Sequence, residues 1–230
     1  MRNDGLQKRN IQQMTQELTP QIMLGAYAAG LFPMASDATD TTLRWYDPDP
    51  RGILPLDGFH LPRRLRRTVL SDQFDVCVDR DFPAVMRACA APAPAPAPGR
   101  ETTWINSEIY RLFCALHDMG FSHSVECWQN GELVGGLYGV ALGGAFFGES
   151  MFSRTTDASK VALVHLVARL RLCGFVVLDT QFGTEHLARF GGEEIPAAEY
   201  KAILEKAVSM QPRWQRNIPA DVLEAEIRNM

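Results

Sequence analysis

The chain has 230 residues, of which 46% are hydrophobic and 22% charged, so it can bury a substantial core as one larger domain or one domain plus a smaller appendage. This composition excludes disorder of the whole chain. The apolar runs are too short to cross a bilayer and no apolar segment follows the polar start, so we expect a cytoplasmic protein without membrane contact. The net charge of -4 argues against a dedicated high-affinity nucleic-acid binder, but it is compatible with a local basic patch. Five cysteines without C-x-x-C spacing predict neither a disulfide framework nor a metal site.

The first predicted region is a small N-terminal subdomain over residues 1–57. Thr19 is suited to cap a short helix, and Gly30 is suited to end it. Two strand-like pieces follow at 43–47 and 52–56, separated by a proline-rich loop. These short elements predict a unit of its own ahead of the larger domain.

The second predicted domain covers residues 58–230. We expect it to open with a helix from Pro62, a strand at 74–79 and a helical piece at 82–90. The alternating Ala and Pro residues at 91–99 cannot form the interior of a helix or a sheet. They predict an exposed, stiff loop.

The part of the chain after this loop has the clearest pattern. Asn130-Gly131 is a strong hairpin signal, which predicts antiparallel strands on either side of it. Thr156 or Asp157 is expected to cap a long apolar helix. We expect helices at 107–119, from the cap at 156 or 157 to 173, at 184–190 and at 197–208. Strands are expected at 122–128, 132–141, 145–152 and 175–178. This order predicts an α/β (α+β) fold with a mixed sheet, and by analogy it is the core order of GNAT-like N-acyltransferases.

Two polar side chains, Asp179 and Gln181, follow the predicted buried strand at 175–178. They are two residues apart, so they share one face while Thr180 points the other way. Open α/β sheets place ligands beyond the ends of their strands, which favours this pair as part of a site. The alternative, that Asp179 caps the helix that follows, is equally open at this point.

A third candidate is the carboxylate of Glu149, which lies in a strand with apolar neighbours. Strand alternation predicts that Glu149 shares a face with Phe147 and Met151, whereas Phe146 and Ser150 lie on the other face. Burying an unpaired carboxylate costs on the order of several kcal/mol, so Glu149 needs a partner or a function. A structural ion pair with an arginine is the alternative.

Two other kinds of chemistry are disfavoured. The run from Gly148 to Phe152 resembles a hydrolase elbow, but it lacks the last glycine and lies inside a strand, which argues against Ser150 as a nucleophile. The junction at 153–159 lacks the [RQ]-x-x-G-x-[GA] phosphate cradle of GNAT enzymes that use coenzyme A. If the chain transfers acyl groups, the expected donor is therefore not acyl-CoA, and no cofactor is predicted.

The densest positive patch contains four arginines within five residues, Arg63 to Arg67. On a helix Arg63 and Arg67 lie one turn apart and can follow phosphates. A solvated helix face is the alternative interpretation. The density of arginines within an acidic protein favours a polyanionic partner.

Several segments, in order along the chain, match one known family. They include Gly30-Leu31-Phe32-Pro33, Leu133 to Gly139, Phe147 to Ser153, Asp179-Thr180-Gln181 and Glu185-His186-Leu187. Together they resemble leucyl/phenylalanyl-tRNA-protein transferases, and the match runs from about residue 18 to residue 200. The central strand motifs are highly specific to that family.

The resemblance implies an aminoacyltransferase that takes leucine or phenylalanine, and methionine less well, from aminoacyl-tRNA. The acceptor would be a protein that begins with arginine or lysine, and the product would carry a degradation signal of the N-degron type. Because the acceptor's α-amine attacks an ester that is already activated, no covalent enzyme intermediate, metal or cofactor is implied.

The resemblance also implies roles for particular residues. Gln181 would position the attacking amine through its amide oxygen, and Asp179 would orient that amide. The full set carried over is Asp179 and Gln181 as catalytic residues; Glu149, Phe146, Leu137, Met151, Leu178 and Ser150 as substrate-binding residues; and Trp104, Tyr27, Arg63 and Arg67 as tRNA-binding residues.

Two alternatives remain at this stage. The first is a GNAT-like acyltransferase that uses another carrier, and the missing coenzyme A cradle argues against it. The second is a non-catalytic tRNA-binding protein, and the combination of Glu149, Asp179 and Gln181 argues against it.

Overall fold

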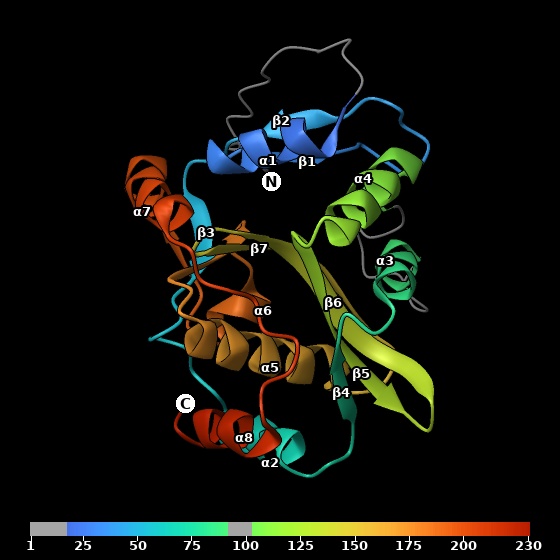
Figure 1. Cartoon of the computed structure of the whole chain (residues 1–230), viewed down its shortest axis with the longest axis vertical. Helices are drawn as coiled ribbons and strands as arrows, with labels where there is room; N and C mark the ends of the chain where they lie inside the picture. Colours follow the sequence, from blue (N-terminus) through green and yellow to red (C-terminus); the bar gives the residue numbers. More distant parts are fainter. Residues whose placement is uncertain (1–17, 92–102) are drawn as a thin grey trace, which may run out of the picture.

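The centre of the molecule is a seven-stranded mixed sheet, seen in a computed structural model that describes residues 18–91 and 103–230 (Figure 1). The strand order is β4-β5-β6-β7-β8-β3-β9, and all neighbours are antiparallel except β7 and β8. The strands are β3 (Arg51–Leu54), β4 (Asp75–Val78), β5 (Ser122–Gln129), β6 (Glu132–Leu142), β7 (Ala145–Ser153), β8 (Val177–Gln181) and β9 (Glu193–Ile195). The predicted α+β fold with a mixed sheet is confirmed. The predicted Ala/Pro loop at 91–99 lies outside the described residues, apart from Ala91.

Helices cover both faces of this sheet (Figure 1). The face that we call the α5 face packs against α5 (Ala158–Cys173), α2 (Arg63–Val69) and α8 (Ala220–Arg228) around one apolar cluster. The opposite face, the α1 face, packs against α1 (Pro20–Ala28), α3 (Phe82–Ala90), α4 (Ser107–Asp118) and α7 (Ala197–Ser209) around a second cluster. The one-turn helix α6 (Glu185–Ala188) follows β8. None of the helices in the described part of the chain combines the length and apolar character needed to cross a bilayer.

Local signals explain most element boundaries. The Thr19 hydroxyl accepts a hydrogen bond from the Ile22 backbone N–H and so caps α1. Asn130 and Gly131 have positive φ angles of 52° and 80°, which suits the tight turn between β5 and β6. Asp157 occupies the N-cap position of α5, as one of the two predictions has it, but its side chain makes no cap hydrogen bond and instead pairs with Lys160.

The N-terminal segment forms a two-stranded ribbon and also contributes to the large sheet. β1 (Phe32–Met34) pairs with β2 (Arg44–Tyr46), whereas β3 lies between β8 and β9. The predicted subdomain at 1–57 therefore includes a strand of the main sheet. Its boundary stays a prediction, and the pairing of β3 favours a division before Arg51.

A β-bulge at Glu149 changes which residues face each side of β7. Tyr138 lies opposite Ser150 and Gly139 lies opposite Gly148, so Glu149 is the extra residue between them. One extra residue reverses the facing of all side chains beyond it. The prediction that Met151 shares a face with Glu149 is therefore wrong, because Met151 packs on the α5 face.

The only parallel pair in the sheet, β7 and β8, is short. Phe146 pairs with Leu178 and Phe147 pairs with Asp179, and the recorded pairing goes no further along either strand. Both strands continue beyond these pairs, β7 to Ser153 and β8 to Gln181. The candidate polar residues lie at or beyond the point where the pairing ends.

Candidate active site

Asp179 is buried and fully supplied with hydrogen-bond donors. Its Oδ1 accepts from Arg51 Nε at 2.9 Å and from the Gln181 backbone N–H at 2.8 Å. Its Oδ2 accepts from Arg51 Nη2 at 2.6 Å and from the Tyr200 hydroxyl at 2.5 Å. The interpretation of Asp179 as a helix cap is wrong, because Thr184 caps α6. With both oxygens engaged, Asp179 organises its neighbours rather than offering a free acceptor to a ligand.

Arg51 connects the N-terminal segment to the site. Its side chain and that of Asp179 are both 0% exposed, and they form a two-pronged ion pair. Arg51 Nη1 also donates to the Gly30 carbonyl oxygen at 2.9 Å, and the guanidinium lies over the rings of Phe32 and Tyr200. The position of β8 is thus tied to both α1 and α7.

The two carboxylate oxygens of Glu149 differ in their hydrogen bonding. Its Oε1 accepts from the Tyr27 hydroxyl at 2.7 Å and from Gln181 Nε2 at 3.1 Å. The residue as a whole is half-buried, yet Oε2 is out of reach of solvent and has no hydrogen-bond partner among the described residues. Burial raises the pKa of the Glu149 carboxyl to about 7 and outweighs the two hydrogen bonds, which lower it. The predicted alternative, an ion pair of Glu149 with an arginine, is not found among the described residues, and the nearby Arg51 pairs with Asp179.

The Gln181 side chain has a defined direction. Its amide nitrogen donates to Glu149, so the amide oxygen points away from that carboxylate. The expectation that Asp179 orients this amide is wrong: Asp179 binds the Gln181 backbone N–H, and Glu149 orients the side chain. Gln181 also has a positive φ of 67°, an uncommon conformation for a non-glycine residue. Such conformations cluster at functional sites.

Two partners of this site escaped the sequence analysis. Arg51 and Tyr200 are buried and contact Asp179, but neither was proposed as a site residue. A usable signal existed for Arg51, because it begins a strand of apolar residues and a buried guanidinium requires a carboxylate. Tyr200 carries no comparable signal, since its position in α7 is typical of a core aromatic residue.

The predicted apolar substrate-binding residues lie on the other face of the sheet. Leu137, Phe146 and Leu178 belong to the apolar cluster of the α5 face, and Met151 packs against it. Glu149, Gln181 and Asp179 contact residues of the α1 face. Phe146 and Leu178 of the first group and Asp179 of the second lie at the last pairs between β7 and β8.

Gly148 marks this meeting point. A Cβ atom there would lie 3.5 Å from the Asp179 carbonyl oxygen and 3.7 Å from Leu178 Cδ1. Ser150, the remaining predicted substrate-binding residue, lies opposite Tyr138, whose side chain belongs to the cluster of the α1 face. Polar and apolar candidates therefore converge at one place, with Ser150 on the polar side.

The predicted tRNA-binding residues are spread over both faces. Arg63 and Arg67 are exposed on α2, which covers the α5 face. Trp104 is half-buried against the α1-face cluster. Tyr27 is fully buried, with its ring 4.8 Å from that of Phe147, so its hydroxyl contacts Glu149 while the ring is enclosed by protein.

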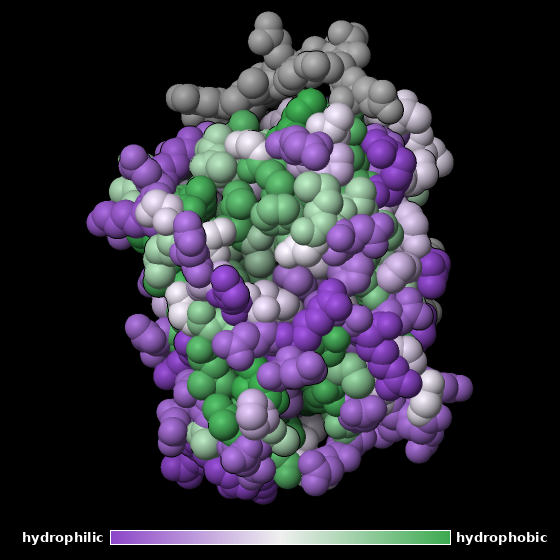
Figure 2. All heavy atoms as spheres, in the orientation of Figure 1, coloured by the Kyte–Doolittle hydropathy of each residue, from purple (hydrophilic) through white to green (hydrophobic). Residues whose placement is uncertain are grey.

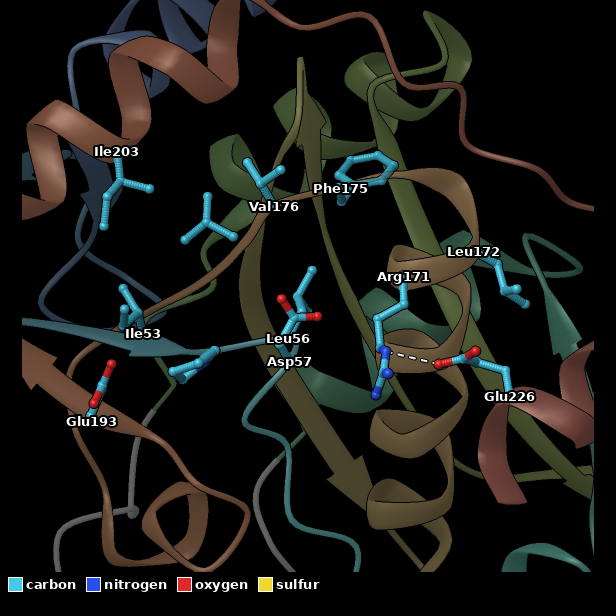
Figure 3. Close-up of a pocket in the computed structure, with 12 residues that line it drawn as sticks. Ile53, Leu56, Asp57, Arg171, Leu172, Phe175, Val176, Glu193, Ile203 and Glu226 are labelled. Carbon is cyan, nitrogen blue, oxygen red and sulfur yellow. Dashed lines mark ion pairs between the residues drawn. The ribbon is translucent and has the colours of Figure 1, made fainter. Parts of the chain in front are cut away.

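A cavity of about 550 Å³ is separate from the polar site. Figure 3 shows it between α7 and the end of α5, with Ile203, Val176 and Phe175 on its walls and the Arg171–Glu226 ion pair at one side. None of Glu149, Asp179 and Gln181 lines it. A second cavity, of about 320 Å³, lies between α1 and α7, and Figure 2 shows apolar side chains gathered at the surface in this upper part of the molecule.

Comparison with known proteins agrees with the motifs. The chain is 58% identical over 200 residues to the leucyl/phenylalanyl-tRNA-protein transferase of Paramagnetospirillum magneticum, a match that covers 87% of this chain and 94% of that protein. It is 52% identical over 214 residues to the protein of the same name from Gluconobacter oxydans, and this match covers 93% of each. Among solved structures, L-PGS from Bacillus licheniformis is similar over 85% of this chain and 58% of that chain, with 14% identity and a TM-score of 0.40.

Family assignment rests on matches to nearly the whole described chain. Residues 53–205 match the family described as leucyl/phenylalanyl-tRNA protein transferase, and residues 16–49 match the N-terminal domain of that family. These matches confirm the resemblance, so the chain is an aminoacyltransferase that transfers an amino acid from tRNA to protein. The chain belongs to the leucyl/phenylalanyl-tRNA-protein transferase family.

Proposed function

We propose that the protein transfers leucine or phenylalanine, and methionine less well, from aminoacyl-tRNA to the N-terminal arginine or lysine of acceptor proteins in the cytoplasm. Family membership supports the reaction class. The observation that carries the proposal is Glu149 Oε2, a buried carboxylate oxygen that has no hydrogen-bond partner among the described residues. An amino group is the complementary ligand, because it supplies both the missing donor and a compensating charge.

In this proposal Glu149 and Gln181 together hold the acceptor's α-amino group. Glu149 Oε2 and the Gln181 amide oxygen are two acceptors, and the hydrogen bond between the two side chains fixes their relative orientation. Asp179 does not contact the amino group in this proposal, but its hydrogen bond holds the Gln181 backbone in its unusual conformation. After the bound ammonium group has lost one proton, the neutral amine attacks the ester carbonyl and forms the peptide bond. The bond from the carbonyl carbon to the tRNA oxygen breaks, and a second proton of the amine goes to that oxygen, so no covalent enzyme intermediate is required.

The donor side chain enters the apolar layer on the α5 face in this proposal. Leu137, Phe146, Met151 and Leu178 supply apolar walls there, next to the end of the β7–β8 pairing. The flexible, unbranched Met151 suits a site that accepts both a branched aliphatic and an aromatic side chain. Placing the ester at the meeting point of the two faces puts the amine on one side of the sheet and the donor side chain on the other.

The tRNA itself is proposed to bind through separate contacts. Exposed Arg63 and Arg67 on α2 suit the phosphate backbone, and half-buried Trp104 suits stacking with a base near the acceptor end. Tyr27 then serves mainly through its hydroxyl, which supports Glu149 next to the terminal adenosine. The product is proposed to be a substrate for the N-degron pathway of protein degradation.

The test is a transfer assay with leucyl-tRNA that carries labelled leucine. We expect label on a peptide that begins with arginine and none on a matched peptide that begins with alanine. Glu149→Gln should reduce transfer by at least about 100-fold, whereas Glu132→Gln, the same change at an exposed position on the neighbouring strand, should leave it unchanged. Label on both peptides would indicate transfer without N-terminal recognition, and label on neither would overturn the proposed function.

A further inference from the structure

The segment between α7 and α8, residues 210–219, crosses the outside of α5 without forming a helix or strand (Figure 1). We call it the strap. It lies on the α5 face, which the proposed function assigns to the donor side chain. The side chain of Trp214 turns inward from the strap and packs against the apolar cluster of that face.

Trp214 contacts a proposed wall of the donor pocket directly. Its ring stacks on Phe146 with centroids 5.6 Å apart and planes 25° apart. It also stacks on His123 at 4.7 Å and meets Phe175 edge to face at 6.5 Å. The indole therefore covers the side of Phe146 that faces away from the sheet.

The other side of Phe146 is closed by a glycine of the sheet. A Cβ atom at Gly139 would lie only 2.4 Å from Phe146 Cε1, so the ring rests directly on the backbone of β6. Phe146 is thus held between Gly139 and Trp214. Phe146 and Leu178 are paired on adjacent strands, so in the proposed function the position of the Phe146 ring determines where the donor pocket beside Leu178 ends.

Hydrogen bonds and an ion pair on the residues that follow Trp214 hold the strap in place. Arg169 of α5 is 5% exposed, and its Nη1 donates to the carbonyl oxygens of Gln215 and Arg216 at 3.3 and 3.2 Å. Arg216 Nε donates to Oδ2 of the buried Asp79 at 2.9 Å. Asp79 Oδ2 also lies 2.8 Å from His123 Nδ1, so the anchor and the stacking partner of Trp214 belong to one network.

We propose that Trp214 determines donor specificity by fixing Phe146 as the end wall of the pocket for the donor side chain. The inference rests on the proposed function. Removing the indole opens space behind Phe146, so the ring can withdraw and the pocket deepens. A deeper pocket favours large donor side chains over leucine, because the contacts that hold leucine are lost while a larger side chain fills the space.

The experiment measures kcat/KM for tRNA charged with leucine, phenylalanine or tryptophan, each with the same arginine peptide. For Trp214→Ala we expect the tryptophan-to-leucine ratio to rise about tenfold relative to the unchanged protein. Trp214→Phe keeps an aromatic ring against Phe146 and should change the ratio by less than about twofold. Arg213→Gln, a change at the exposed neighbour on the same strap, should leave the ratio unchanged.

A ratio separates a specificity role from a merely structural one. Partial unfolding lowers the active fraction for every donor equally, so it cancels from the ratio measured on one preparation. If Trp214→Ala does not fold, Trp214→Leu should raise the ratio in the same direction. An unchanged ratio in a folded, active Trp214 variant overturns the inference, whereas failure of the unchanged protein to transfer any of the three amino acids overturns the proposed function instead.

Discussion

The surroundings of Asp179 and of Glu149 differ sharply, although the two carboxylates lie on neighbouring strands. Asp179 has two donors on each oxygen and a cation in direct contact. Glu149 has both of its donors on one oxygen, and no described residue forms an ion pair with it. A fully satisfied carboxylate stabilises the fold, whereas a half-satisfied one costs stability and can be satisfied by a ligand.

The largest expected effect follows from removing the ion-pair partner of Asp179. Arg51→Met should lower the free energy of unfolding by about 3–5 kcal/mol, because it leaves the buried Asp179 without its compensating charge. Urea unfolding measures the change. The control is Arg44→Met, which breaks a partly exposed ion pair with Asp40 and should cost about 0–1 kcal/mol. Equal losses in the two variants would remove the basis for treating Asp179 as a structural anchor.

Replacing Glu149 by glutamine should lower the transfer activity but raise the stability of the fold at pH 8. Glu149→Gln should reduce transfer by at least about 100-fold, since the charge that holds the amine is lost. The folded-state pKa of Glu149 is raised from 4.5 to about 7, so the folded chain binds the proton more tightly than the unfolded chain does. Stability contributed by this group is therefore lost as the pH rises from about 4.5 through 7. At pH 8 the glutamine variant should consequently be more stable, by about 1–3 kcal/mol.

Both measurements use the same pair of proteins. Transfer assays and urea unfolding at pH 8 are compared for Glu149→Gln and for the exposed Glu132→Gln. A glutamine variant at 149 that is less stable than the unchanged protein would mean that Oε2 already has a partner.

The pH dependence of transfer should report Glu149 but not Asp179. Below pH 7 the carboxyl of Glu149 becomes protonated and no longer attracts the amino group, so kcat/KM should fall about tenfold per pH unit. The midpoint of this limb should lie at about pH 7. If the residual activity of Glu149→Gln shows the same fall of kcat/KM below pH 7, the fall belongs to another group.

The smallest expected effect comes from the donor that supports Glu149. The hydroxyl of Tyr27 lowers the pKa of Glu149, so Tyr27→Phe should move the midpoint of the limb to higher pH by less than about one unit. Tyr110→Phe provides the matched change, because that hydroxyl bonds Arg87 at another place in the fold. A shift toward lower pH in Tyr27→Phe would contradict the geometry.

Local patterns were enough to predict most elements and to single out polar residues that the structure brings together. Asn130-Gly131 indicated its hairpin, Thr19 its helix, and Asp179 and Gln181 a site at the end of a strand, all from residues close in sequence. The partners of Asp179 could not be found in this way. Arg51 is 128 residues away in the chain, and only the insertion of β3 beside β8 brings the two together.

The facing of β7 was mispredicted for a different physical reason. Alternation assumes one residue per pairing position, and the bulge at Glu149 breaks that assumption. Apolar residues on both sides of Glu149 hide the change, since Phe147 and Met151 are equally suited to either face. Only the register with β6, where Gly139 and Tyr138 face Gly148 and Ser150, reveals it.

The bulge also limits how this site can change during evolution or in design. A point substitution alters one side chain, but deleting the extra residue would turn every position from Ser150 onward to the opposite side and remove Met151 from the apolar layer of the α5 face. The strand that carries Glu149 can therefore change in residue type far more readily than in length. A redesign that transplants Glu149 onto another acyltransferase scaffold must carry the irregular stretch of β6 and β7 with it as one unit.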